Sequence, residues 1–197
     1  MSELHFWYEF SSPTSYLAAM RLDELAKAKG VATVWQPFMW GGLVRMQNPS
    51  PPPPEVAQVR ADYMWRDAER QAKRYGLPFK KPTKFPRPAG LAAQVAQLGI
   101  SERWGKVFSR KVLAANFVED LDIQEPKVIG SVLARMDLNP ESVMKRALTE
   151  DIKAALKRET ERAYEKGYFG VPTFVVGDEM FWGEDRLEQA LETAARA

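Results

Sequence analysis

The sequence predicts an α/β protein in which a large all-helical segment separates a βαβ half from a ββα half. Three observations support this fold class. Residues 4–39 show a strand pattern, a helix pattern and a second strand pattern; residues 48–167 are dominated by helix patterns; and strand patterns return only at 170–182. We therefore expect an α/β domain made of residues 1–47 and 168–197, with residues 48–167 as an inserted helical domain.

The first half predicts a βαβ unit. Leu4–Phe10 is short and aromatic, as a strand should be, and it stops before Ser12-Pro13, a pair typical of a helix N-cap and first helical position. The helix ends at Gly30, and Val31–Met39 predicts a second strand, which Pro37 ends or places at a sheet edge. A helix between two strands predicts a parallel pair.

The middle segment opens with a stiff proline loop, Pro51–Pro54. This loop is either a polyproline ligand for another protein or a connector into a new subdomain, and we favour the connector. Helix patterns then cover residues 55–75, 90–98, 101–118, 125–136, 140–148 and 150–166.

The C-terminal half predicts a ββα unit. A strand at 170–176 turns through Gly177-Asp178 into a second strand at 179–182, and a helix follows over 184–195. The order βαβ, helical insertion, ββα is that of a thioredoxin-like fold with a helical domain inserted between its halves.

The composition excludes several kinds of chemistry. With no cysteine, the chain has no disulfide, no cysteine nucleophile and no CxxC redox pair. One histidine, His5, leaves no histidine-rich metal site or serine–histidine–aspartate triad, so no metal is expected. Charges of 28 Lys plus Arg against 26 Asp plus Glu alternate along the chain, which argues against nucleic-acid or membrane partners. Without a signal-peptide pattern or a long apolar run, we expect a cytoplasmic protein.

Three segments could form a binding site if the fold is correct. At the start of the first helix, Ser12 either donates a hydrogen bond to a bound anion or only caps the helix. In the third strand, Pro172 follows Val171, whose backbone a cis peptide would expose to a peptide-like ligand; the alternative is an ordinary trans proline at an edge. At the last helix, Glu184 and Asp185 are either helix-dipole partners or, for Asp185, a ligand for an ammonium group.

These segments carry a resemblance to a known family. Phe10–Leu17, with Ser12-Pro13 and Ser15-Tyr16-Leu17, resembles the signature of 2-hydroxychromene-2-carboxylate isomerases and kappa-class glutathione transferases. Further similar blocks are Arg60-x-x-Tyr63-x-x-x-Asp67, Tyr75–Pro78 with Phe85-Pro86, Tyr168–Phe174 and Phe181–Leu187. The resemblance covers essentially the whole chain, and Ser12 stands where related disulfide oxidases keep a cysteine.

The resemblance implies glutathione as cofactor. It implies that Ser12 stabilises the glutathione thiolate and that Val171, before a cis Pro172, pairs through its backbone with the cysteinyl part. The remaining implied ligands are Glu184 and Asp185 at the γ-glutamyl end, and Asn48 and Arg60 near the glycyl end or the substrate. The sequence departs from the family in three places: Glu184 would repel the γ-glutamyl carboxylate unless it points away, Arg60 replaces a lysine, and Thr14 replaces an aromatic residue.

The implied reaction is a cis–trans isomerisation in aromatic catabolism, from 2-hydroxychromene-2-carboxylate to trans-o-hydroxybenzylidenepyruvate. A thiolate adds to the double bond, the bond rotates, and the thiol leaves, without a protein general base. Candidate cations for the carboxylate of this small aromatic substrate are Arg45, Arg60, Lys80, Lys84 and Arg87. A kappa-like transferase or peroxidase acting on other electrophiles and a non-catalytic thioredoxin-like binding protein are the alternatives. The resemblance also implies a homodimer.

Overall fold

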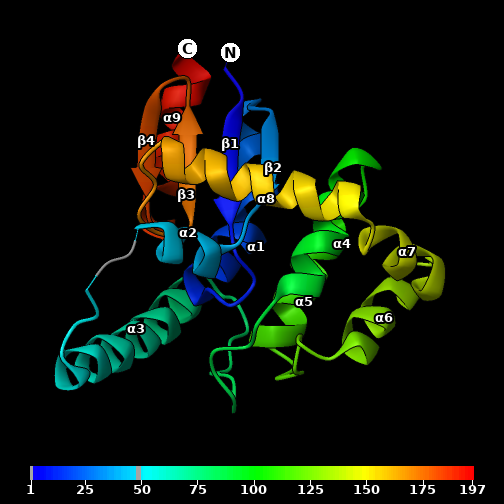
Figure 1. Cartoon of the computed structure of the whole chain (residues 1–197). Coiled ribbons are helices and arrows are strands. Elements are labelled where there is room, and N and C mark those ends of the chain that lie inside the picture. Colours follow the sequence, from blue (N-terminus) through cyan, green and yellow to red (C-terminus); the bar gives the residue numbers. More distant parts are fainter. Residues whose placement is uncertain (1, 48–49) are drawn as a thin grey trace.

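A four-stranded mixed sheet forms the centre of the molecule in the computed structural model, which describes residues 2–47 and 50–197 (Figure 1). The strands are β1 (Leu4–Tyr8), β2 (Thr33–Pro37), β3 (Thr173–Val176) and β4 (Glu179–Trp182), in the order β2-β1-β3-β4. β1 runs parallel to β2 and antiparallel to β3, and β3 runs antiparallel to β4. The predicted parallel pair and C-terminal hairpin are confirmed, and Pro37 is the last residue of the edge strand β2.

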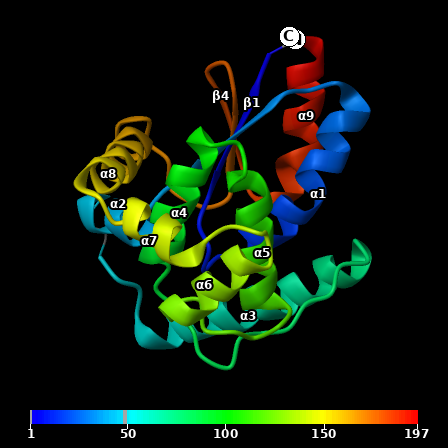
Figure 2. The same cartoon turned by 90° about the vertical axis from the view of Figure 1, so that its right-hand side faces the viewer.

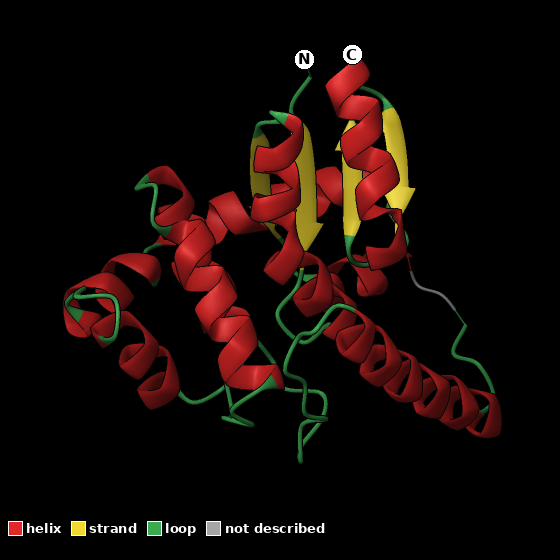
Figure 3. Cartoon of the chain, turned by 180° about the vertical axis from the view of Figure 1, so that it is seen from behind, coloured by secondary structure: helices red, strands yellow, loops and turns green. Residues whose placement is uncertain are grey.

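Helices cover both faces of the sheet. α1 (Pro13–Lys29) and α9 (Leu187–Arg196) lie side by side on one face, seen in front in Figure 3. α8 (Glu150–Glu165) crosses the opposite face (Figure 1). Side chains of β1 alternate between the two faces of the sheet. Phe6 belongs to the main hydrophobic core, whereas Trp7 packs on the α8 side with Ala163 and Tyr168.

The remaining described helices do not form one bundle: four of them pack on one another beside the sheet, and two pack separately against the helices on its faces (Figures 1 and 2). These remaining helices are α2 (Trp40–Gln47), α3 (Pro54–Arg74), α4 (Gly90–Ser101), α5 (Gly105–Phe117), α6 (Pro126–Ala134) and α7 (Pro140–Ala147). One hydrophobic cluster runs without a break from the sheet residue Phe174 through Leu17 of α1 to Phe108 of α5 and Ile129 of α6. The α/β part and the helical segment therefore share a core. Within the described residues, no helix is long and apolar enough to cross a membrane.

The thioredoxin-like fold with its helical insertion is confirmed, but one helix was missed and several element boundaries differ from the prediction, including two helix starts. α2 was not predicted, because Gly41 and Gly42 disfavour a helix when only the sequence is considered. The helix expected at 101–118 begins at Gly105, after a turn in which Arg103 has φ 67°. The last helix starts as a 3-10 turn, η1 (Glu184–Arg186), before it becomes α-helical.

Candidate active site

Ser12 is the N-cap of α1. Its backbone is extended, with φ −89° and ψ 118°, and its Oγ accepts a hydrogen bond from the Ser15 N–H at 3.1 Å while Pro13 occupies the first turn. The same oxygen lies 2.9 Å from Thr14 Oγ1. Ser12 is thus a structural cap, and its hydroxyl also belongs to a polar group at the positive end of the α1 dipole.

A cavity of about 680 Å³ opens at this helix end, within the size range of small-molecule sites. Its walls come from the β1–α1 turn, α2, α3, the loop before α4 and the segment before β3. The lining residues are Glu9, Ser11–Thr14, Met39–Gly42, Arg45, Met64, Phe85, Pro86, Pro88, Ala89, Phe169–Val171 and Trp182. The fold therefore brings Ser12 and Val171, which are far apart in the sequence, to one largely apolar cavity.

The Val171 segment forms the cavity wall next to the first turn of α1. The Val171–Pro172 peptide is cis, as the resemblance implied, and the Val171 carbonyl accepts a hydrogen bond from Thr14 Oγ1 at 3.0 Å. The Trp182 indole covers Gly170 so closely that a Cβ there would lie 1.9 Å from its Nε1. Glycine at position 170 is required by this contact.

Glu184 and Asp185 begin η1 and point to different surroundings. The buried Glu184 carboxylate is ion-paired with Arg21 of α1 at 3.2 Å, and the same guanidinium lies 3.6 Å from the centroid of the Tyr75 ring. Burial raises the pKa of Glu184, although the Tyr75 hydrogen bond and Arg21 oppose the shift. Glu184 does not line the cavity, whereas Asp185 is exposed; their roles as glutathione ligands stay predictions.

Two other predicted ligands are Asn48 and Arg60, and Arg60 is not among the cavity walls. Asn48 lies outside the described residues. Arg60 is an exposed residue of α3, one helical turn before Met64, which does line the cavity. A role for Arg60 toward a ligand also stays a prediction.

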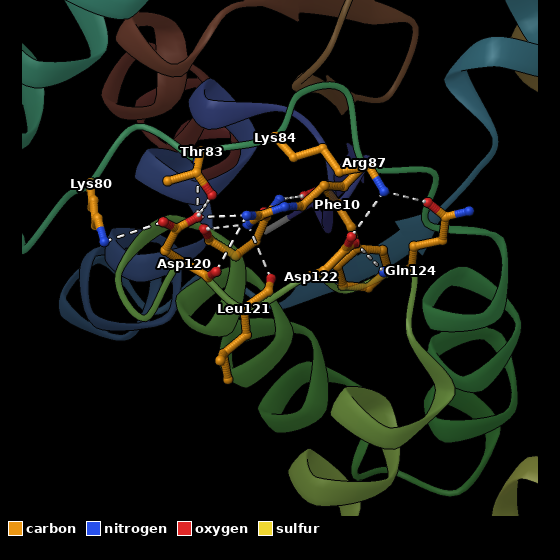
Figure 4. Close-up of polar contacts among 10 residues, drawn as sticks. Phe10, Lys80, Thr83, Lys84, Arg87, Asp120, Leu121, Asp122 and Gln124 are labelled. Atoms are coloured by element: carbon orange, nitrogen blue, oxygen red, sulfur yellow. Dashed lines mark hydrogen bonds and ion pairs between the residues drawn. The ribbon is translucent and has the colours of Figure 1, made fainter.

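Three of the candidate cations are engaged in structural contacts (Figure 4). Lys80 and Arg87 both pair with Asp120, at 3.2 Å and 2.5 Å, and Lys84 pairs with Asp122 at 3.1 Å. The hydrogen bond from the Thr83 N–H, and to a smaller extent the one from the Arg87 guanidinium, hold the pKa of Asp120 well below its usual range. Of the five candidate cations, Arg45 lines the cavity.

Sequence analysis missed Glu9, a carboxyl group in the same cavity. It is partly buried among apolar walls, and its Oε2 accepts a hydrogen bond from the Ser11 N–H at 2.8 Å. Burial raises the pKa of Glu9 from 4.5 to about 7, although the Ser11 hydrogen bonds oppose the shift. The signal was available, since an acidic residue at the end of an otherwise apolar strand is unusual.

This raised pKa predicts a pH-dependent stability. The folded state binds a proton that the unfolded chain releases between pH 4.5 and about 7, so the free energy of unfolding should fall as the pH rises through that window. At 1.36 kcal/mol per pKa unit, we expect Glu9 to contribute a loss of about 3 kcal/mol. Glu9→Gln should remove this part of the slope in urea unfolding measured at several pH values. An unchanged slope would contradict the assignment.

The comparisons with known proteins agree with this fold. The protein-family model described as the DsbA-like thioredoxin domain matches residues 3–194 of this chain. The 2-hydroxychromene-2-carboxylate isomerase of Pseudomonas sp. strain C18 is 30% identical over 92% of this chain and 85% of its own, and that of Pseudomonas putida is 29% identical over 92% and 89%. A solved structure of a 2-hydroxychromene-2-carboxylate isomerase superposes with a TM-score of 0.88 at 24% identity, over 98% of this chain and 94% of that one.

The fold and the site together define a class of protein. It is a DsbA-like thioredoxin domain that contains no cysteine and has a serine at the start of its first helix. The chain belongs to the DsbA-like thioredoxin family and, within it, to the group that contains the 2-hydroxychromene-2-carboxylate isomerases. A more distant relative, glutathione S-transferase kappa 2 of Caenorhabditis elegans, is 21% identical over 96% of this chain and 90% of its own.

Proposed function

We propose that this chain is a glutathione-dependent isomerase that converts 2-hydroxychromene-2-carboxylate to trans-o-hydroxybenzylidenepyruvate. The observation that carries the proposal is the placement of the Ser12 hydroxyl and the α1 N-terminus in one cavity with the Val171 backbone. Relatives named for this reaction, which align over most of both chains, support the choice of substrate.

The residues of the cavity fit glutathione. A peptide-like ligand needs backbone partners, an anchoring site for its sulfur and a volume of some hundreds of Å³, and the cavity supplies each of these. When bound, glutathione supplies a thiolate nucleophile. The Ser12 hydroxyl can turn from Thr14 to donate to that anion, and the N-terminus of α1 adds the positive end of the helix dipole.

Arg45 is the residue we assign to the substrate carboxylate. It projects from α2 into a cavity whose other walls are mostly apolar and aromatic, a suitable setting for an aromatic carboxylate. A hydrogen bond to a charged group contributes about 1.5–3 kcal/mol. We therefore expect Arg45→Gln to raise KM for the substrate about tenfold or more, with a smaller change in kcat. Steady-state kinetics should show this, with Lys111→Gln, an exposed change on α5, as the matched control. An unaltered KM would remove Arg45 from the site.

A kappa-like transferase or peroxidase is the second candidate function, because of the kappa-class relative and the small Thr14 side chain at the cavity wall. Turnover of hydroxychromene carboxylate should be compared with turnover of aromatic halides and hydroperoxides. Faster reaction with the latter would favour the transferase. No heat and no thermal shift with millimolar glutathione would instead favour a non-catalytic binding protein.

A further inference from the structure

Glu9 and Ser12 are held at the two ends of one tight turn. The Ser12 N–H donates to the Glu9 carbonyl at 3.3 Å, the hydrogen bond that closes a four-residue β-turn. In such a turn the first and last Cα atoms lie within about 7 Å of each other. The Glu9 carboxyl folds back over the turn to the Ser11 N–H at 2.8 Å, so it is held beside the start of α1.

The carboxyl group has one oxygen available to a ligand. Oε2 accepts from Ser11, and among the described residues no hydrogen bond or ion pair engages Oε1. Both Glu9 and Ser12 line the cavity, so a group anchored at Ser12 lies in the same space as this carboxyl.

Few other charges face Glu9. Within the described part of the chain, the other charged side chain lining the cavity is Arg45, which projects from α2. The remaining walls from α2, α3 and the loops are uncharged. Arg87, whose carbonyl accepts from Ser11 Oγ, directs its guanidinium away to Asn116 and Asp120 (Figure 4). Among the described residues no cation is ion-paired with Glu9, so no such pair holds its carboxyl in the ionised form.

We propose that Glu9 is the proton acceptor for the bound thiol, an inference that rests on the proposed function. The Glu9 carboxylate takes the thiol proton as glutathione is seated: the S–H bond breaks, an O–H bond forms at Oε1, and the electron pair stays on sulfur beside Ser12. At the end of the reaction the same proton returns from the carboxyl to the departing sulfur. No other reactant is consumed, and the charge of the closed cavity does not change.

The proton affinities of the two groups suit this exchange. Glu9, with a pKa of about 7, lies below a free thiol at about 8.5, and the α1 dipole lowers the thiol further. General bases work best when their pKa lies near the working pH. The sequence suggested an isomerase without a protein base; Glu9 supplies one.

The test counts protons released per thiolate formed. Glutathione is titrated calorimetrically into the protein in two buffers of different ionisation enthalpy, and the ultraviolet absorbance of the thiolate is recorded in parallel. Between pH 7 and the pKa of the free thiol, the wild type should form thiolate with almost no proton released, because the thiolate beside Glu9 disfavours a second negative charge and the carboxyl therefore keeps the proton. Below pH 7, where Glu9 is already protonated, the ratio should rise toward one. Glu9→Gln should give a ratio near one at every pH.

Two further variants complete the test. Glu9→Asp, which keeps a carboxyl group, should retain a pH-dependent ratio with a shifted midpoint, and Glu179→Gln, an exposed change on β4, should behave as the wild type. A wild-type ratio of one above pH 7, or a ratio near zero in Glu9→Gln, would overturn the assignment of Glu9 alone. A complete lack of glutathione binding would overturn the proposed function together with this inference.

Discussion

Ser12→Ala should lower the turnover of hydroxychromene carboxylate by about 10- to 100-fold, since each 1.4 kcal/mol of lost transition-state stabilisation is a factor of ten. The Ser12 hydroxyl lines the cavity and can donate a hydrogen bond to a bound thiolate, whereas alanine has no donor. The loss should appear in kcat and kcat/KM together, because the hydroxyl is needed most where negative charge is held on sulfur.

The same change removes a helix cap, so a matched control is needed. Asn139 caps α7 in the same way, with its Oδ1 accepting from the Ser142 N–H at 3.0 Å, and it is remote from the cavity. Ser12→Ala and Asn139→Ala should each cost about 1 kcal/mol of stability. Turnover should fall in Ser12→Ala and stay unchanged in Asn139→Ala. Wild-type turnover in Ser12→Ala would remove the hydroxyl from the mechanism.

Arg87→Met should lower the free energy of unfolding by about 3–5 kcal/mol, the usual cost of breaking a buried charge cluster from one side. The guanidinium is 2% exposed and donates to Asn116 Oδ1 at 2.9 Å and to the Leu121 carbonyl at 3.0 Å, besides its pair with Asp120 (Figure 4). Methionine fills much of the same volume but leaves these acceptors without a donor. Urea unfolding measures the loss.

The control for Arg87 is an exposed ion pair of the same type. Arg135 and Glu119 pair at 3.1 Å on the surface, so Arg135→Met should change stability by about 1 kcal/mol or less. An equally small effect for Arg87→Met would show that its cluster does not stabilise the fold. Asn116 also donates to the Phe10 carbonyl at 2.9 Å, so loss of Arg87 should loosen the turn that leads to Ser12.

Local sequence patterns were sufficient to predict the structural features that depend on residues close together in the sequence. The parallel β1–β2 pair, the hairpin at Gly177 and the Ser12 cap depend on residues close in the sequence, and each was predictable. α2 was missed because its stability comes from packing: Leu43 is fully buried in the small cluster with Trp7 and Tyr168, and this contact offsets the poor helix propensity of two glycines.

The candidate site was predictable in its residue types but not in their partners. Five cations were equivalent in the sequence, and the fold separates them: Asp120 and Asp122, more than thirty residues from the lysines and arginine that they bind, occupy Lys80, Lys84 and Arg87. Likewise, whether Glu184 faces a ligand depends on Arg21, which reaches it from another helix. Ion pairs between residues far apart in the chain leave no periodic pattern in the sequence, so the sequence did not predict them.

By itself, the sequence determined the fold class and the absence of a protein thiol, because composition and short-range periodicity are properties of the chain alone. The family resemblance further implied that this serine stands where related oxidases keep a cysteine. Only the tertiary structure decided which groups share the cavity with Ser12, since burial and proton affinity depend on neighbours brought together by folding. Glu9 illustrates this: in the sequence it is one acidic residue among many, and in the folded protein it is a desolvated carboxyl group one turn from Ser12.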